Sequence, residues 1–143
     1  MPDIQHAIAR AQGTTGATDY QVAIHAGRHD ITADEPPIRG GTDAGPAPYD
    51  LVLSGLVACT AITLRMYAQR KGWSLVGVRV EATLVKRGDT SHVDRRLWLQ
   101  GDLTLDQEAG LLAIAERTPV TLTLKNGLEM RTELQSNGDS MWP

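Results

Sequence analysis

Residues 45–73, GPAPYDLVLSGLVACTAITLRMYAQRKGW, decide the fold, because they hold the longest apolar segment of the chain together with its single cysteine, Cys59. Two prolines open the stretch, and a pair of cations followed by Gly72 closes it. Proline in the first turn, cations in the last turn and glycine just beyond are the signals of an α-helix. We expect a helix over residues 49–71, which would be about 34 Å long at about 1.5 Å per residue.

The first half of this expected helix is apolar on almost every face, and a helix of that kind is buried nearly all round. A membrane span is the alternative interpretation. The uninterrupted apolar character ends at Arg65, however, short of the roughly 20 residues that a bilayer core requires. Ser54, Thr60 and Thr63 dilute it further. We therefore expect the central helix of a soluble protein rather than a membrane span.

The bulk composition narrows the class of protein. A length of 143 residues suits one domain with a respectable core. The net charge of −3 and the scattered basic residues argue against a nucleic-acid partner. The first ten residues lack the cationic flank and apolar run of a signal peptide, and one cysteine cannot form an internal disulfide. We expect a cytoplasmic protein.

Upstream of the helix, the sequence predicts a hairpin and a stiff loop. Residues 1–17 show no pattern, and we expect them to be irregular. Alternating polarity over residues 19–26 predicts a strand with one buried face, which returns through a tight turn into residues 29–33. Residues 34–47 are rich in proline and glycine, as is typical of a connecting loop of restricted geometry.

Downstream of the helix, a second hairpin is expected. Residues 76–86 alternate between apolar and polar side chains, and residues 93–101 form the partner strand, with Leu97 and Leu99 on one face. The polar residues 87–91 between them form the turn.

A second helix follows over residues 105–117. Thr104 and Gln107 have the spacing of a capping box, in which each side chain bonds the other residue's backbone amide. Leu112, Ala115 and their neighbours form its expected apolar stripe.

The chain is expected to end in a strand. Pro119 ends the second helix, because a residue before proline avoids the helical region. Residues 128–134 then form a last strand, and residues 136–143 are frayed. Helices and strands are segregated, which predicts a single α+β domain over residues 18–135 with a mainly antiparallel sheet. Such a sheet covers one face of the long helix, so the other face predicts a homodimer.

Cys59 is the first candidate for chemistry. Its neighbours at helical spacing carry no charge, and a free cysteine packs well as a small hydrophobe, so these residues alone favour an inert thiol. A reactive thiol would need a cation or base from another segment. Arg28, Arg39 and His29 are the nearest candidates upstream.

Metal and cofactor sites are not expected. His25 and His29 are four residues apart, but a turn separates them and no further ligands stand at suitable spacing. No phosphate-binding loop is present. Arg95 and Arg96 are most simply the solvated side of a strand.

The motifs resemble those of a known family. Residues 45–51 (GPAPYDL), 58–60 (ACT) and 63–73 (TLRMYAQRKGW), followed by 115–124 (AERTPVTLTL), look like the OsmC/Ohr family of thiol-dependent hydroperoxide reductases. The resemblance runs over about residues 29–134. It implies an α+β fold with a long central helix on a mainly antiparallel sheet, in an intertwined homodimer with two active sites at the interface.

The resemblance also implies a mechanism. In the family, a helix cysteine attacks an organic hydroperoxide, and Cys59 matches it. A second cysteine in a Cys-Pro motif closes a disulfide that a dithiol reduces, and this position falls on Thr118. Threonine cannot form that disulfide, so a sulfenic acid on Cys59 would need an external thiol.

An arginine and a glutamate poise the attacking cysteine in the family. The glutamate position falls on Tyr49, beside which Asp50 is the nearby acid. Arg39 is at a plausible distance before the helix to be the arginine, and Arg28 is the alternative.

We therefore expect a cytoplasmic, homodimeric one-cysteine thiol peroxidase that acts on organic hydroperoxides, needs no cofactor and is recycled by an external thiol. The alternative is an inactive dimer that holds a small hydrophobic ligand in a pocket over Cys59. A third, weaker interpretation is a structural domain of a larger assembly.

Overall fold

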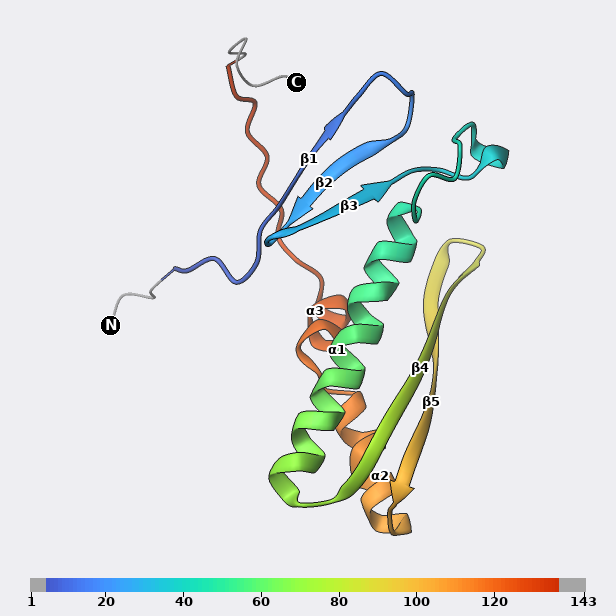
Figure 1. Cartoon of the computed structure of the whole chain (residues 1–143), viewed down its shortest axis with the longest axis vertical. Coiled ribbons are helices and arrows are strands. Elements are labelled where there is room, and N and C mark those ends of the chain that lie inside the picture. The colour runs from blue at the N-terminus through green and yellow to red at the C-terminus, as the bar shows by residue number, and fades with distance from the viewer. Residues whose placement is uncertain (1–4, 137–143) are drawn as a thin grey trace. The chain divides into compact units, whose positions relative to one another are not determined.

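The computed structural model describes residues 5–136, and their contacts group them into two compact units. The described chain up to Leu51 forms the first unit together with the residues from Glu133 onward, and Val52–Thr132 forms the second. Helices and antiparallel sheets occur as separate segments of the chain (Figure 1). The predicted α+β class is confirmed.

The first unit is built on a three-stranded antiparallel sheet in the order β1-β2-β3. Strand β2 (Val22–Ala26) pairs with β3 (His29–Ala33) across a tight turn, where Gly27 takes a positive φ of 58°. The hairpin prediction is confirmed, although β2 begins three residues later than the alternation suggested.

Strand β1 (Ala11–Thr15) contradicts the prediction that residues 1–17 are irregular. Its sequence, AQGTT, has small and polar side chains with no apolar alternation, so it carries no strand signal. Backbone pairing to β2, from Ala11 opposite Ala26 to Thr15 opposite Val22, holds it in place. Such pairing needs no particular side chain.

The loop that follows β3 is ordered by Asp34, whose side chain is almost fully buried. Its carboxylate accepts hydrogen bonds from the backbone amides of Glu35, Thr42 and Ala44 and from the Thr42 hydroxyl. A Cβ on Gly41 would overlap the carbonyl of Glu35, so only glycine fits there. A single turn of 3₁₀ helix, η1 (Pro37–Arg39), lies within the loop.

The long helix α1 (Pro48–Lys71) confirms the central prediction from the sequence. It ends where the glycine signal placed it: Gly72 has a φ of 70°, and the amide of Trp73 donates to the carbonyl of Ala68 at 2.9 Å. This is the left-handed glycine cap that satisfies the last carbonyls of a helix.

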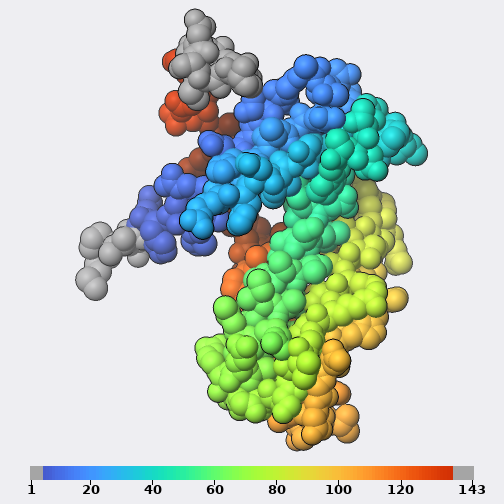
Figure 2. Space-filling view, viewed as in Figure 1, coloured from blue at the N-terminus to red at the C-terminus, as the bar shows by residue number. Residues whose placement is uncertain are grey.

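The expectation that α1 is buried nearly all round is wrong for the described part of a single chain. Its buried residues lie four apart on one stripe: Leu56, Thr60, Leu64 and Ala68. Ile62 is 53 % exposed, and α1 (green) runs uncovered along one side of the second unit (Figure 2). By length and composition alone, α1 could also cross a membrane. Core helices of soluble proteins meet the same criterion.

Strands β4 (Ser74–Arg87) and β5 (Thr90–Asp102) form the antiparallel hairpin of the second unit. Both strands are longer than expected, because the turn is tighter: Gly88 takes a positive φ of 59° and leaves only two residues between the strands. A bulge lies near the start of β4, between Leu75 and Gly77.

Arg65 ties α1 to this bulge. One nitrogen of its guanidinium donates to the carbonyls of Leu75 and Val76, each at 2.7 Å. The bulge leaves these carbonyls outside the regular ladder, and the arginine satisfies them.

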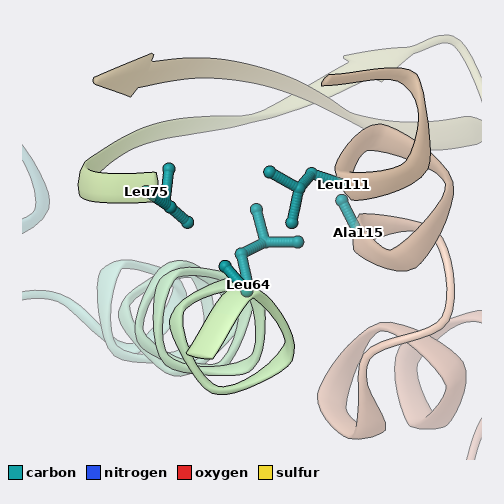
Figure 3. Packing of buried hydrophobic residues seen from close by; sticks show 5 residues of the cluster. Leu64, Leu75, Leu111 and Ala115 are labelled. Carbon is teal, nitrogen blue, oxygen red and sulfur yellow. The ribbon is translucent and has the colours of Figure 1, made fainter. Parts of the chain in front are cut away.

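The core of the second unit lies between α1, β4 and α2 (Leu105–Ala115). Leu64, Leu75, Leu111 and Ala115 point toward one another there (Figure 3). The capping box at the start of α2 is confirmed. The expected apolar stripe is confirmed at Ala115, which is buried, but it is wrong at Leu112, which is 57 % exposed; the neighbouring Leu111 is the buried leucine.

The chain after α2 differs from the prediction. Pro119 does not only end one helix; it starts another, α3 (Pro119–Asn126), with Thr118 as its N-cap. Residues 128–134 are not a strand, because they pair with no other strand among residues 5–136. Alternating polarity predicts a strand only where a sheet edge is available to pair with it. Residues 137–143, most of the expected frayed end, lie outside the described residues.

Candidate functional site

Cys59 lies near the middle of α1 and is partly buried. It follows the buried Leu56 by three residues, so it flanks the stripe that packs into the second unit. Its sulfur lies 3.9 Å from the hydroxyl of Thr63, one helical turn further on. The thiol is therefore neither sealed in the core nor fully in solvent.

The next residue, Thr60, is fully buried and anchors this turn of the helix. Its hydroxyl donates to the carbonyl of Leu56 at 2.7 Å and accepts a hydrogen bond from the guanidinium of Arg95 at 3.0 Å. The prediction that Arg95 is on the solvated side of its strand was wrong. Its side chain is only 12 % exposed.

Arg95 joins four elements of the second unit. From β5, its guanidinium reaches Thr60 on α1, Thr121 on α3 at 2.9 Å, and the carbonyl of Ala115 at the end of α2 at 2.7 Å. Glu116 lies 3.5 Å away. A buried guanidinium is stable when its donors and its charge are matched in this way.

Glu116 also pairs with Lys125, at 2.8 Å. This hydrogen bond, helped by the charges of Lys125 and Arg95, holds the pKa of Glu116 below its usual range. The carboxylate therefore stays ionised and balances the two cations at neutral pH.

Thr118, which the resemblance places at the position of a second cysteine, is fully buried. Its hydroxyl lies 2.6 Å from that of Thr121 and accepts from the Thr121 backbone amide, which makes it the cap of α3. Thr60 and Thr121 share one nitrogen of Arg95, so the turns that carry Cys59 and Thr118 are linked through it.

The other predicted site residues belong to the first unit. Arg28 is exposed at the β2–β3 turn, and Arg39 is exposed at the end of η1. Tyr49 is 68 % exposed in the first turn of α1, and Asp50 there accepts a hydrogen bond from the amide of Ala47. Their roles toward Cys59 stay predictions.

A pocket of about 560 Å³ opens in the second unit beside Arg95. Cys59 is not among its lining residues, so this pocket is not the one expected over the thiol. Both apolar side chains, mostly leucines, and charged side chains line it. Among them are Leu56, Leu97, Leu124, Arg95, Glu116 and Lys125.

Alternation within β5 could have revealed Arg95. Leu97 and Leu99 lie on one face of the strand, and Arg95, two residues before Leu97, lies on the same face. Arg96, on the opposite face, is exposed as expected.

Metal ligands do not gather in the described chain. Among residues 5–136, no group of three or more His, Cys, Asp or Glu side chains could hold a metal ion.

Comparison with known proteins defines the class. Residues 41–133, most of the chain, match the OsmC-like protein family. The chain therefore belongs to the OsmC-like protein family, as its helix motifs indicated.

Solved structures share the fold. One, from Mycoplasma pneumoniae, is an OsmC-like protein, with a TM-score of 0.72 and 16 % identity over 85 % of this chain and 89 % of that one. An organic hydroperoxide resistance protein OsmC from Legionella pneumophila has a TM-score of 0.62 and 20 % identity, over 85 % of this chain and 92 % of that one. The organic hydroperoxide resistance protein OhrB of Bacillus subtilis has a TM-score of 0.56 and 21 % identity, over 84 % of this chain and 93 % of that one. No curated protein matches the sequence.

Proposed function

We propose that this OsmC-like protein reduces organic hydroperoxides in the cytoplasm, with Cys59 as its single nucleophile and an external thiol as reductant. The observation that carries the proposal is a partly buried free thiol in the middle of the long helix of an OsmC-like fold. Structural relatives described as organic hydroperoxide resistance proteins support the substrate class.

The reaction balances without a cofactor. The Cys59 thiolate attacks one peroxide oxygen, the S–O bond forms and the O–O bond breaks, and the alkoxide leaves and takes a proton as the alcohol. Cys59 is now a sulfenic acid. An external thiol condenses with it and releases water, and a second thiol frees Cys59 and leaves as the external disulfide.

An external reductant is needed because Thr118 cannot act as a resolving thiol. Cys59 is the only cysteine in the sequence. The hydroxyl of Thr118 is committed to the α3 cap.

The proposed assembly is a homodimer. Several large apolar side chains of α1 are exposed in the single chain, which a partner subunit would cover. They include Val52, Ile62 and Met66. Arg39, or Arg28 in its place, with Tyr49 and Asp50, would complete the site around Cys59.

A second candidate function is ligand binding without turnover, and the leucine-lined pocket of about 560 Å³ favours it. A pocket of this size suits a small apolar molecule.

Mass measurement separates the two functions. The purified protein is exposed briefly to cumene hydroperoxide and its intact mass is recorded. With limiting peroxide, a peroxidase gains the mass of one oxygen atom at Cys59 during the brief exposure. The Cys59→Ser variant gains none. An unmodified thiol in the wild type would contradict the peroxidase and favour ligand binding.

A further inference from the structure

We propose that Arg95 is a positioning residue for Cys59: its guanidinium fixes the turn of α1 that carries the thiol against the first turn of α3. The consequence for peroxide reduction rests on the proposed function. The effect on the placement of the thiol does not.

The contacts come from one buried side chain. A single nitrogen of Arg95 donates to the hydroxyls of Thr60 at 3.0 Å and Thr121 at 2.9 Å, and the second terminal nitrogen donates to the carbonyl of Ala115 at 2.7 Å. The side chain is 12 % exposed, so water competes weakly for these bonds.

Thr60 transmits the constraint to Cys59. Its hydroxyl is held on both sides, by Arg95 and by the carbonyl of Leu56, and the residue is fully buried. Cys59 precedes Thr60 in the same helical turn, so the contacts that hold Thr60 also restrain the backbone that carries Cys59.

The contacts favour arginine over lysine. The planar guanidinium offers a fork of donors that reaches three acceptors on three helices at once, whereas an ammonium is a point charge on a flexible stem. The charge is also well placed. It lies at the carboxyl end of α2, where the helix dipole is negative, and 3.5 Å from Glu116.

The functional effect follows from geometry. Attack on a peroxide needs the sulfur and the O–O bond in line, and a displacement of about 1 Å in such a site can cost about a hundredfold in rate. Loss of Arg95 frees the Cys59 turn and leaves the reacting sulfur itself unchanged.

The experiment compares Arg95→Met, Arg95→Lys and Thr60→Val with two matched controls. Arg96→Met removes a charge from the exposed face of the same strand. Arg65→Met removes another arginine that bonds two backbone carbonyls, at the start of β4. Three quantities are measured: urea stability, the single-turnover rate of Cys59 with cumene hydroperoxide, and the rate of Cys59 alkylation by iodoacetamide.

Opposite changes in the two rates are the expected signature. In Arg95→Met the hydroperoxide rate falls about tenfold to a hundredfold, while alkylation of the loosened thiol rises about fivefold. Arg95→Lys recovers part of the loss, and Thr60→Val shows a smaller loss in the same direction. Arg65→Met loses stability, but both of its rates stay within about twofold of the wild type. Arg96→Met changes nothing.

Equal rate changes in Arg95→Met and Arg65→Met would overturn the proposal, because they would show a merely structural role. So would unchanged rates in Arg95→Met. If wild-type Cys59 does not react with hydroperoxide, the proposed function fails, and the alkylation rates still decide the role of Arg95.

Discussion

At the scale of single residues, Asp34 organises the loop that leads into α1. Amides of Ala44, Glu35 and Thr42 and the Thr42 hydroxyl surround its carboxylate, with the Ala44 amide the largest contributor, and they hold its pKa below the usual range. These donors favour the ionised form, so the network is strongest when Asp34 is charged.

This pKa predicts how stability depends on pH. A depressed pKa in the folded state contributes stability above the unfolded value of about 3.9, and the contribution is lost as the pH falls through the folded value. We expect Asp34→Asn to be less stable than the wild type in urea unfolding at pH 7 and at pH 5. The difference should narrow below about pH 4. A difference that stays constant down to pH 2.5 would contradict the assignment.

Cys59 and Arg95 show how far single residues could be placed from the sequence. The position of Cys59 on the long helix was predicted correctly. The alternation of β5 places Arg95 on the buried face, although its charge favours an exposed position. Its partners Thr60, Thr121 and Ala115 lie on three other elements, and local patterns carry no information on such contacts.

At the scale of elements, α3 depends on Thr118. The sequence Thr118-Pro119 is a helix start, with a capping hydroxyl followed by proline at the first position. The same proline also fits the end of α2, so the sequence alone does not distinguish the end of one helix from the start of the next. Residues 128–134 have the alternation of a strand, but pairing is a property of the partner as much as of the segment.

Removal of the cap tests this account. We expect Thr118→Ala to lose about 1 to 2 kcal/mol of stability, because α3 loses its N-cap and the buried Thr121 hydroxyl loses a neighbour. Thr118→Ser keeps the capping oxygen and should lose less than half as much. Urea unfolding measures both, and equal losses would show that the methyl group, rather than the hydroxyl, matters.

At the scale of the whole molecule, the α+β class and the family could be predicted from the sequence, because the apolar pattern of α1 and the signals that flank it are local. The predicted burial of α1 on all sides failed for the single chain. Within the part of the chain that the structure describes, one stripe of the helix is buried, formed by Leu56, Thr60, Leu64 and Ala68. The proposed homodimer accounts for the apolar side chains that stay exposed.

Light scattering tests the homodimer. We expect the wild type to have twice the chain mass of 15.5 kDa. Ile62→Glu should give a monomer, because burying an unpaired carboxylate costs several kcal/mol. Ala109→Glu adds the same charge on the exposed side of α2 and should leave the dimer intact. A monomeric wild type would contradict the assembly.

The proposed function requires that Cys59 turns over organic hydroperoxide without a second cysteine. The most direct measurement is steady-state consumption of cumene hydroperoxide by purified protein, with dithiothreitol and with glutathione as reductants, alongside Cys59→Ser. We predict many turnovers per subunit with at least one of these thiols, and none above the uncatalysed rate for Cys59→Ser. Equal consumption by the two proteins would contradict the claim.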